Sequence, residues 1–501
     1  MKPQSWSWIF VVTGVAIRCV AINQPLVDAH LIRQCQTAAA TKSLIEEGGF
    51  HLSSKIPWLA DLNAHYVQEL PLYNYLTIAA VHLTHDVDLS SKLVSILLWA
   101  GSFLCLQFIW RRVLTEHETL WANLLFVVAP MSIFYGQAAM PEMLVQLLAF
   151  AFLLLIARYD ESPTLGNWMF CASVGAAGLL VKLPEVAHLY LVLAFILIRK
   201  EHWRVLIRPR YWIAAVLTIV LLKTWSSYVD SVNGAFLPEW TSMRNLRSFI
   251  GPIAIRFDIK SWATVVAYVT TFIFAGPSML GAAYGLWLAV RKKRQGLLCL
   301  WLLSLVAFYL VWLGNGPATQ SYYNLPSLAP LCALFGIGAS ALLSFVRIAS
   351  WRRAATIFAG LVVIVPAIPI GRYLFKQDRQ VLAAALWTKA NTQPQDVILF
   401  RPNHRWDFVD YPYNPVLSYY SDRPTFVWTR NTPELYRRKA LEEARYAVVT
   451  LPQPPPNGLM GYITKARASN RQPESTEWLL NSGFRLVVND PRFQVYQRQT
   501  Q

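Results

Sequence analysis

Long runs of apolar residues, broken by short polar connections, fill the first 372 positions of the chain. A helix needs roughly 20 predominantly apolar residues to cross a bilayer, and about eleven runs approach that length. The pattern therefore predicts a polytopic α-helical membrane protein with about 11 transmembrane helices. The predicted spans are residues 6–22, 93–110, 119–135, 141–157, 165–182, 184–198, 211–229, 263–290, 295–314, 322–346 and 354–371.

After Arg372 the apolar runs become shorter and alternate with polar residues. Helical periodicity over 378–392 is followed by strand-like segments, and helix-start signals appear at Thr432 and Glu474. This pattern predicts a small α/β domain over residues 373–501, following a transmembrane domain over 1–372 that includes a long loop at 23–92. The predicted strands are 396–400, 426–428, 446–451, 484–488 and 493–496.

Composition agrees with a membrane protein, because 55% of residues are hydrophobic and only 15% are charged. The net charge of +17 could indicate nucleic-acid binding. However, Lys and Arg concentrate in alternate connections, such as 199–210 and 291–294, as the positive-inside rule describes. The charge is therefore read as a topology signal, which argues against a nucleic-acid partner. It predicts a cytoplasmic N-terminus in the cytoplasmic (inner) membrane, with loop 23–92 and the C-terminal α/β domain extracytoplasmic.

Polar side chains gather where the first span ends. Asp28 could accept a proton from an incoming hydroxyl, while Arg33 could hold a departing phosphate by charge-assisted hydrogen bonds. His30 and Gln34 lie in the same polar stretch. A structural interpretation stays open, in which Asp28 caps the following helix and Arg33 pairs with lipid headgroups.

Further polar groups fall on the outward side of the predicted topology. Glu142 begins a span, where the helix dipole alone would favour a carboxylate. Lys182 lies between two apolar spans, so it either snorkels to the interface or finds a partner in Glu185, a lipid headgroup or a bound phosphate. Tyr322 and Tyr323 could bind a phosphate or sugar, or belong to the aromatic belt.

Five motifs occur in order: Asp28-x-His30-x-x-Arg33-Gln34, Gln68-Glu69-Leu70-Pro71, Met140-Pro141-Glu142, Val181-Lys182-Leu183-Pro184 and Tyr322-Tyr323-Asn324. Together they resemble bacterial family 39 glycosyltransferases of the GT-C superfamily, which are similar to protein O-mannosyltransferases and lipid A aminoarabinose transferases. The resemblance implies an inverting transfer of a hexosyl or pentosyl group from a polyprenyl-phosphate donor to an acceptor hydroxyl on the outer face of the membrane.

The resemblance also implies residue roles. Asp28 corresponds to the catalytic base, Glu142 to the acidic residue of the Met-Pro-acid motif, and Arg33 and Lys182 to phosphate-handling cations. Glu69 takes the place of a residue that closes the sugar pocket. All these groups are expected to meet in one outward-facing site. No metal site is assigned, although Asp28, Glu69 and Glu142 could hold the divalent cation that some relatives use.

The partners implied are a lipid-linked sugar, the bilayer, and a lipid, glycan or protein acceptor. Protein O-mannosyltransferases commonly carry a β-trefoil domain, whereas this chain ends in an α/β module, so their protein acceptor is not carried over. The alternative function is a membrane transporter or flippase of lipid-linked sugars. Such a protein is expected to show repeated halves and helices broken near the midplane, and the sequence shows no internal repeat.

Overall fold

The computed structural model describes residues 5–56, 64–291, 296–314, 316–402, 413–429, 431–451 and 476–499. Two compact units divide the chain. The helical unit comprises Met1–Ile22, Val67–Leu76 and Leu89–Leu374, and the loop-and-sheet unit comprises Asn23–Tyr66, Thr77–Asp88 and Phe375–Gln501. The sequence predicts that the loop at 23–92 belongs with the membrane spans, whereas in the structure Asn23–Tyr66 and Thr77–Asp88 fall in the same unit as the C-terminal residues.

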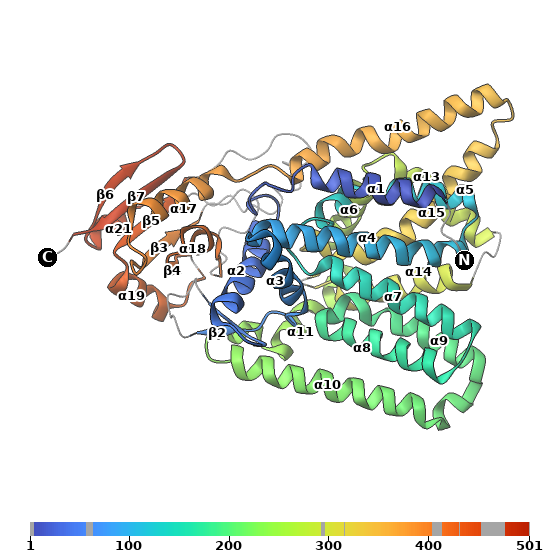
Figure 1. Ribbon diagram of the computed structural model, residues 1–501, viewed down its shortest axis with the longest axis horizontal. Coiled ribbons are helices and arrows are strands. Elements are labelled where there is room, and N and C mark those ends of the chain that lie inside the picture. The colour runs from blue at the N-terminus through green and yellow to red at the C-terminus, as the bar shows by residue number, and fades with distance from the viewer. Residues whose placement is uncertain are drawn as a thin grey trace. The chain divides into compact units, whose positions relative to one another are not determined.

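Long helices build the helical unit (Figure 1). Helices lie within every run predicted as a span. They are α1 (Ser5–Cys19), α4 (Val87–Val113), α5 (Glu116–Val128), α6 (Pro130–Tyr135), α7 (Glu142–Glu161), α8 (Leu165–Ala187), α9 (Leu189–Glu201), α10 (Pro209–Asn233), α11 (Ser242–Ile250), α12 (Ile259–Tyr268), α13 (Ser278–Arg291), α14 (Gly296–Trp312), α15 (Leu325–Ser344) and α16 (Ala349–Leu374), with the short helical turns η1 (His202–Ile207), η2 (Pro238–Trp240), η3 (Ile253–Phe257), η4 (Val269–Ile273) and η5 (Ser321–Asn324) between them.

Within the described residues, six helical stretches are long and apolar enough to cross a membrane, or seven if one bent pair counts as a single span. The chain is thus a multi-pass membrane protein, but the count of eleven spans is not confirmed. The bent pair falls at 263–290, where the sequence predicts one span; instead Ile259–Ile273 and Ser278–Arg291 meet at 108°. Ala275 and Gly276 there have φ values of 49° and 92°, which a helix cannot accommodate.

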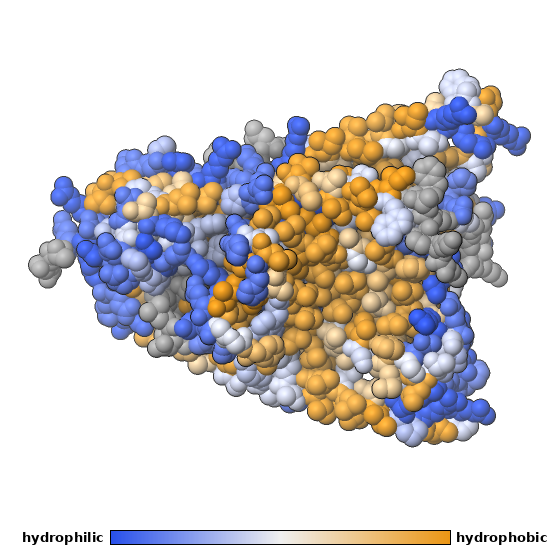
Figure 2. Space-filling model, viewed as in Figure 1, coloured by the Kyte–Doolittle hydropathy of each residue, from blue (hydrophilic) through white to orange (hydrophobic). Residues whose placement is uncertain are grey.

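Hydrophobic side chains cover the outer face of the helical unit. In Figure 2 they spread over its helices and give way to hydrophilic side chains at the connection between α9 and α10. On α10, Leu217 and Ile219 are 57% and 64% exposed. A continuous exposed apolar surface of this kind suits lipid rather than water.

Close helix contact through glycine fixes the centre of the helical unit. A Cβ built on Gly285 of α13 would lie 1.8 Å from the carbonyl oxygen of Leu334 in α15, and one on Gly338 would lie 1.9 Å from the oxygen of Gly281. Small residues let helix backbones approach at this distance. The glycine contact holds α15 against α13 and, because η5 directly precedes α15, it also helps to fix Tyr322 and Tyr323.

A mixed five-stranded sheet forms the C-terminal part of the loop-and-sheet unit. The strand order is β4-β3-β5-β7-β6, with β3 parallel to β4 and β5, and β7 antiparallel to β5 and β6. Leu399, Phe426 and Val449 contribute to its buried core. The strands are β3 (Ile398–Arg401), β4 (Thr425–Val427), β5 (Tyr446–Thr450), β6 (Phe484–Asn489) and β7 (Phe493–Arg498), and the helices are α17 (Arg379–Asn391), α18 (Val416–Ser421), α19 (Glu434–Glu443) and α21 (Glu477–Asn481).

All five predicted strands and the helix at 378–392 are confirmed. The helix predicted from Thr432 is confirmed as α19, while Glu474 lies outside the described residues. The loop contributes α2 (Leu31–Glu47), a short antiparallel pair of β1 (Ser54–Lys55) and β2 (His65–Tyr66), and most of α3 (Leu72–Thr84).

Candidate active site

A kink in α8 presents the most unusual charged residue of the helical unit. Lys182 has φ −158° and ψ 92°, which departs from helical geometry inside the C-terminal part of α8. Pro184 follows two residues later, and a proline inside a helix removes a backbone hydrogen bond and disturbs the preceding turn. The Lys-Leu-Pro sequence thus interrupts an apolar span at the residue that carries its charge.

The Lys182 ammonium is held by two carboxylates. Its Nζ lies 2.7 Å from Glu142 Oε1 and 2.7 Å from Glu185 Oε1. Glu142 is the first residue of α7, and Glu185 is one turn beyond Lys182 on α8. Both carboxylates are fully buried and Lys182 is 6% exposed. The ammonium is therefore paired inside the bundle instead of snorkelling, and Glu185 is one of the partners that the sequence suggested.

Two tyrosine rings complete this cluster. Lys182 Nζ lies 4.6 Å from the ring centroids of both Tyr322 and Tyr323, within the range of a cation–π interaction. Both rings are buried, at 8% and 6% exposed, and they contact each other at a centroid distance of 4.5 Å. Tyr135 packs edge-on against Tyr322, and its hydroxyl is 2.8 Å from Ser321 Oγ.

The cluster has unequal numbers of positive and negative groups. Two carboxylates face one ammonium, so full ionisation would leave one excess negative charge in a buried position. Glu142 Oε2 and Glu185 Oε2 have no hydrogen-bond partner among the described residues. Buried polar atoms are normally hydrogen-bonded, and a bound ligand is one way to meet that requirement. These oxygens can accept hydrogen bonds from hydroxyl groups.

Glu69 belongs to the same unit, in the segment Val67–Leu76. It is half-buried, and the nearby backbone is held by Asn233 of α10. The Asn233 side chain accepts a hydrogen bond from Val67 N and donates one to Val67 O, each at 2.8 Å. The sequence around Asn233 gives no signal for this role, because an amide at the end of an apolar span does not reveal which distant backbone it will bind.

Asp28 lies in the loop-and-sheet unit and is 3% exposed. Gln34 Nε2 donates to Asp28 Oδ1 at 2.6 Å and to the carbonyl of Ala29 at 2.9 Å. Gln34, predicted to bind substrate, therefore holds the carboxylate that was predicted to be the base. The capping interpretation of Asp28 does not describe this contact, since His30 occupies the N-cap of α2.

His30 and Arg33 flank this carboxylate in sequence. His30 has a left-handed backbone with φ 58°, a conformation that histidine adopts more often than most residues other than glycine, as His85 and His202 also do. Arg33 is half-buried in the first turn of α2, and its carbonyl accepts a hydrogen bond from Thr37 Oγ1 at 3.1 Å.

No group of three or more His, Cys, Asp or Glu side chains in the described part of the chain is placed to hold a metal ion.

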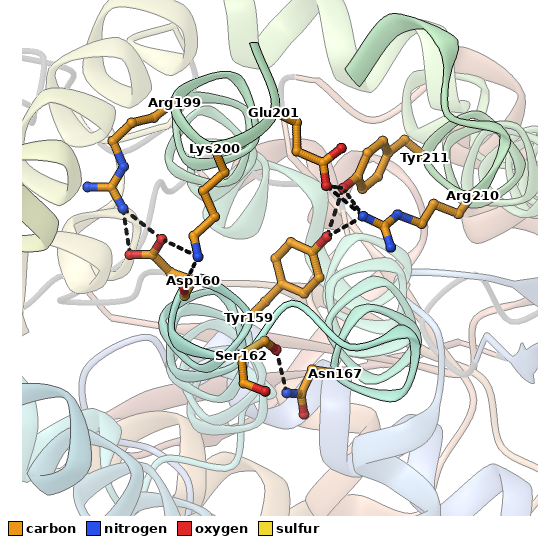
Figure 3. A network of polar contacts seen from close by, with 9 residues as sticks. All are labelled: Tyr159, Asp160, Ser162, Asn167, Arg199, Lys200, Glu201, Arg210 and Tyr211. Atoms are coloured by element: carbon orange, nitrogen blue, oxygen red, sulfur yellow. Dashed lines mark hydrogen bonds and ion pairs between the residues drawn. The ribbon is translucent and has the colours of Figure 1, made fainter. Parts of the chain in front are cut away.

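A second polar network joins α7, α9 and α10 at the connections that carry the positive-inside signal (Figure 3). Asp160 accepts hydrogen bonds from Arg199 at 2.6 Å, and Glu201 accepts them from Arg210 and Tyr211 at 2.6 Å each. These cations therefore also connect α7, α9 and α10.

Comparison with known proteins shows a fold similar to that of GT-C glycosyltransferases. A family model described as dolichyl-phosphate-mannose-protein mannosyltransferase matches residues 68–228. The resemblance noted in the sequence is therefore confirmed. No curated protein matches the chain by sequence.

Three solved structures illustrate the similarity. ArnT from Cupriavidus metallidurans bound to undecaprenyl phosphate has a TM-score of 0.64 at 13% identity, covering 99% of this chain and 98% of that one. An oligosaccharyltransferase from Archaeoglobus fulgidus has a TM-score of 0.52 at 11% identity, covering 89% and 70%. The arabinofuranosyltransferase AftD from Mycobacteria has a TM-score of 0.53 at 14% identity, covering 100% and 40%.

Proposed function

We propose that this protein is an inverting glycosyltransferase that moves a sugar from a polyprenyl-phosphate donor to an acceptor hydroxyl on the outer face of the cytoplasmic membrane. The observation that carries the proposal is the end-to-end similarity in fold to a protein solved with undecaprenyl phosphate. The family match over 68–228 supports it, because the matched region contains Glu69, Glu142 and Lys182.

In this proposal Asp28 is the general base. Its carboxylate would accept the proton of the acceptor hydroxyl while the hydroxyl oxygen attacks the anomeric carbon and the bond to the phosphate oxygen breaks. The hydrogen bond from Gln34 fixes the carboxylate orientation. A positioned general base contributes about 10²- to 10⁴-fold to rate. The departing phosphate is already anionic, so it needs a permanent positive charge more than a proton, and Arg33 supplies such a charge.

The Glu142–Lys182–Glu185 cluster is proposed to bind the donor. An ammonium has three N–H donors; Lys182 donates one to Glu142 Oε1 and forms an ion pair with Glu185, which leaves donor capacity for a substrate oxygen. The second oxygens of Glu142 and Glu185 can accept hydrogen bonds from sugar hydroxyls. Tyr322 and Tyr323 add aromatic surface and hydroxyl groups beside the ammonium.

The test is transfer of a radiolabelled sugar from polyprenyl phosphate in proteoliposomes. Wild-type protein is expected to form a covalent glycosylated product, and Asp28→Asn is expected to reduce kcat at least 10²-fold with unchanged folding. Asp490→Asn, which alters a carboxylate paired with Arg492 in the sheet domain, is a matched control and should keep wild-type turnover.

Two results would overturn the assignment. Near wild-type turnover in Asp28→Asn would show that Asp28 is not the general base. Exchange of labelled lipid-linked sugar across the membrane without a covalent product would instead identify a transporter or flippase. Mass spectrometry of lipid that co-purifies with the protein would identify the donor class.

A further inference from the structure

The residues just before Asp28 are hydrogen-bonded to C-terminal residues through one backbone N–H and one backbone carbonyl. Leu26 N donates to the Tyr420 hydroxyl at 2.6 Å, and Asp378 N donates to the carbonyl of Val27 at 2.6 Å. Leu26 and Val27 are fully buried. The two residues that lead into the proposed base are thus fixed by residues more than 350 positions later in the chain.

Tyr420 connects this segment to a second part of the loop. Its hydroxyl accepts from Leu26 N and donates to Asp88 Oδ2 at 2.8 Å, while the neighbouring Tyr419 hydroxyl donates to Asp88 Oδ1 at 2.5 Å. Burial, with nearby negative charge, raises the pKa of both tyrosines well above the ordinary value. Both hydroxyls therefore stay protonated and keep donating across the working pH range.

The C-terminal end of α18 makes a further connection. Asp422, the C-cap residue in a left-handed conformation, accepts hydrogen bonds from Lys42 of α2 and Lys389 of α17. Gln36 of α2 also donates to the carbonyl of Tyr413 at 2.9 Å. Helix α2, which carries Gln34 and so holds Asp28 from its C-terminal side, is thus attached to the same short helix region.

We propose that α18 is a positioning element for catalysis, in which the Tyr420 hydroxyl holds the backbone at Leu26 and thereby sets the location of the Asp28 carboxylate. The inference rests on the proposed function and gives the C-terminal domain a role in it. Reacting groups must be held closely, since a misplacement of about 1 Å can cost about 10²-fold in rate. A base on a long loop needs such external support, because loops are more mobile than the elements they connect.

Tyr420→Phe and Tyr419→Phe form a matched pair for the test. Each removes one hydroxyl and one hydrogen bond to Asp88, but only Tyr420→Phe also removes the acceptor for Leu26 N. In the full-length protein, Tyr420→Phe is expected to lower kcat about 10- to 100-fold. The KM for the lipid-linked donor should stay within about 2-fold, and Tyr419→Phe should retain most of the wild-type kcat.

Amide hydrogen exchange provides a readout that does not depend on turnover. Faster exchange at residues 26–30 is expected in Tyr420→Phe but not in Tyr419→Phe. Equal exchange and equal kcat in the two variants would overturn the inference, as would a Tyr420→Phe effect confined to KM. If wild-type protein transfers no sugar, the proposed function fails, and unchanged exchange in Tyr420→Phe would independently refute the positioning contact.

Discussion

Replacing Lys182 with methionine tests the buried charge cluster most directly. Methionine is close to lysine in length and is apolar, so Lys182→Met removes the charge while largely filling the space. In the wild-type structure the Lys182 ammonium forms ion pairs with two fully buried carboxylates. In the variant Glu142 and Glu185 would face each other without a cation between them.

The expected loss follows from these contacts. Removing one partner of a buried ion pair costs about 3–5 kcal/mol, because it leaves an uncompensated buried charge. Two carboxylates lose their partner here, and the cation–π contacts with Tyr322 and Tyr323 are lost as well, so we expect a value of about 5 kcal/mol. At about 2 °C per kcal/mol this loss corresponds to a fall of about 10 °C in melting temperature.

Intrinsic fluorescence during thermal unfolding in detergent measures the effect, since the chain has 20 tryptophans. The triple variant Lys182→Met, Glu142→Gln, Glu185→Gln is the control, because it removes the unpaired charges together with their cation. It should recover most of the lost stability. A single variant that melts within 1–2 °C of wild type, about 1 kcal/mol, would show that the cluster is not buried as described. A triple variant as unstable as the single one would show that charge is not the cause.

Two further predictions concern packing and pH. Gly285→Ala should lower the free energy of unfolding by about 1–3 kcal/mol, because the new Cβ would lie 1.8 Å from the Leu334 oxygen. Gly360→Ala is the control: it has open space around it, so the change should be neutral or slightly stabilising. Equal melting temperatures for both variants would contradict the close α13–α15 contact. Burial acts to raise the pKa of Asp422, but hydrogen bonds from Lys389 and Lys42 outweigh it and lower that pKa below 3.8. A lowered pKa in the folded state stabilises above the ordinary pKa, so the difference in stability between wild type and Asp422→Asn should be constant from pH 5 to 8, then shrink below pH 3.8. A stability difference between wild type and Asp422→Asn that grows as the pH falls would contradict the lowered pKa of Asp422.

Hydropathy and local periodicity determined the element types of this protein. Apolar runs located helices throughout the first 372 residues, and alternation located all five strands of the C-terminal sheet. These predictions succeed because the hydrophobic pattern of a segment's own residues reflects whether the segment is buried or exposed to lipid. The same reasoning failed at 263–290, where average hydropathy is insensitive to one Ala-Gly turn that bends the chain by 108°.

Sequence also indicated that Lys182 needs a partner, since an ammonium in an apolar span is costly without one. The sequence alone could not identify Glu142, 40 positions away, as a partner of Lys182. That choice depends on how α7 packs against α8. Likewise, the sequence marked Asp28 as a candidate base, but only the tertiary structure brings Gln34, Tyr420 and Asp378 to its segment. Contacts between distant residues depend on the packing of whole elements, which no short window of residues contains.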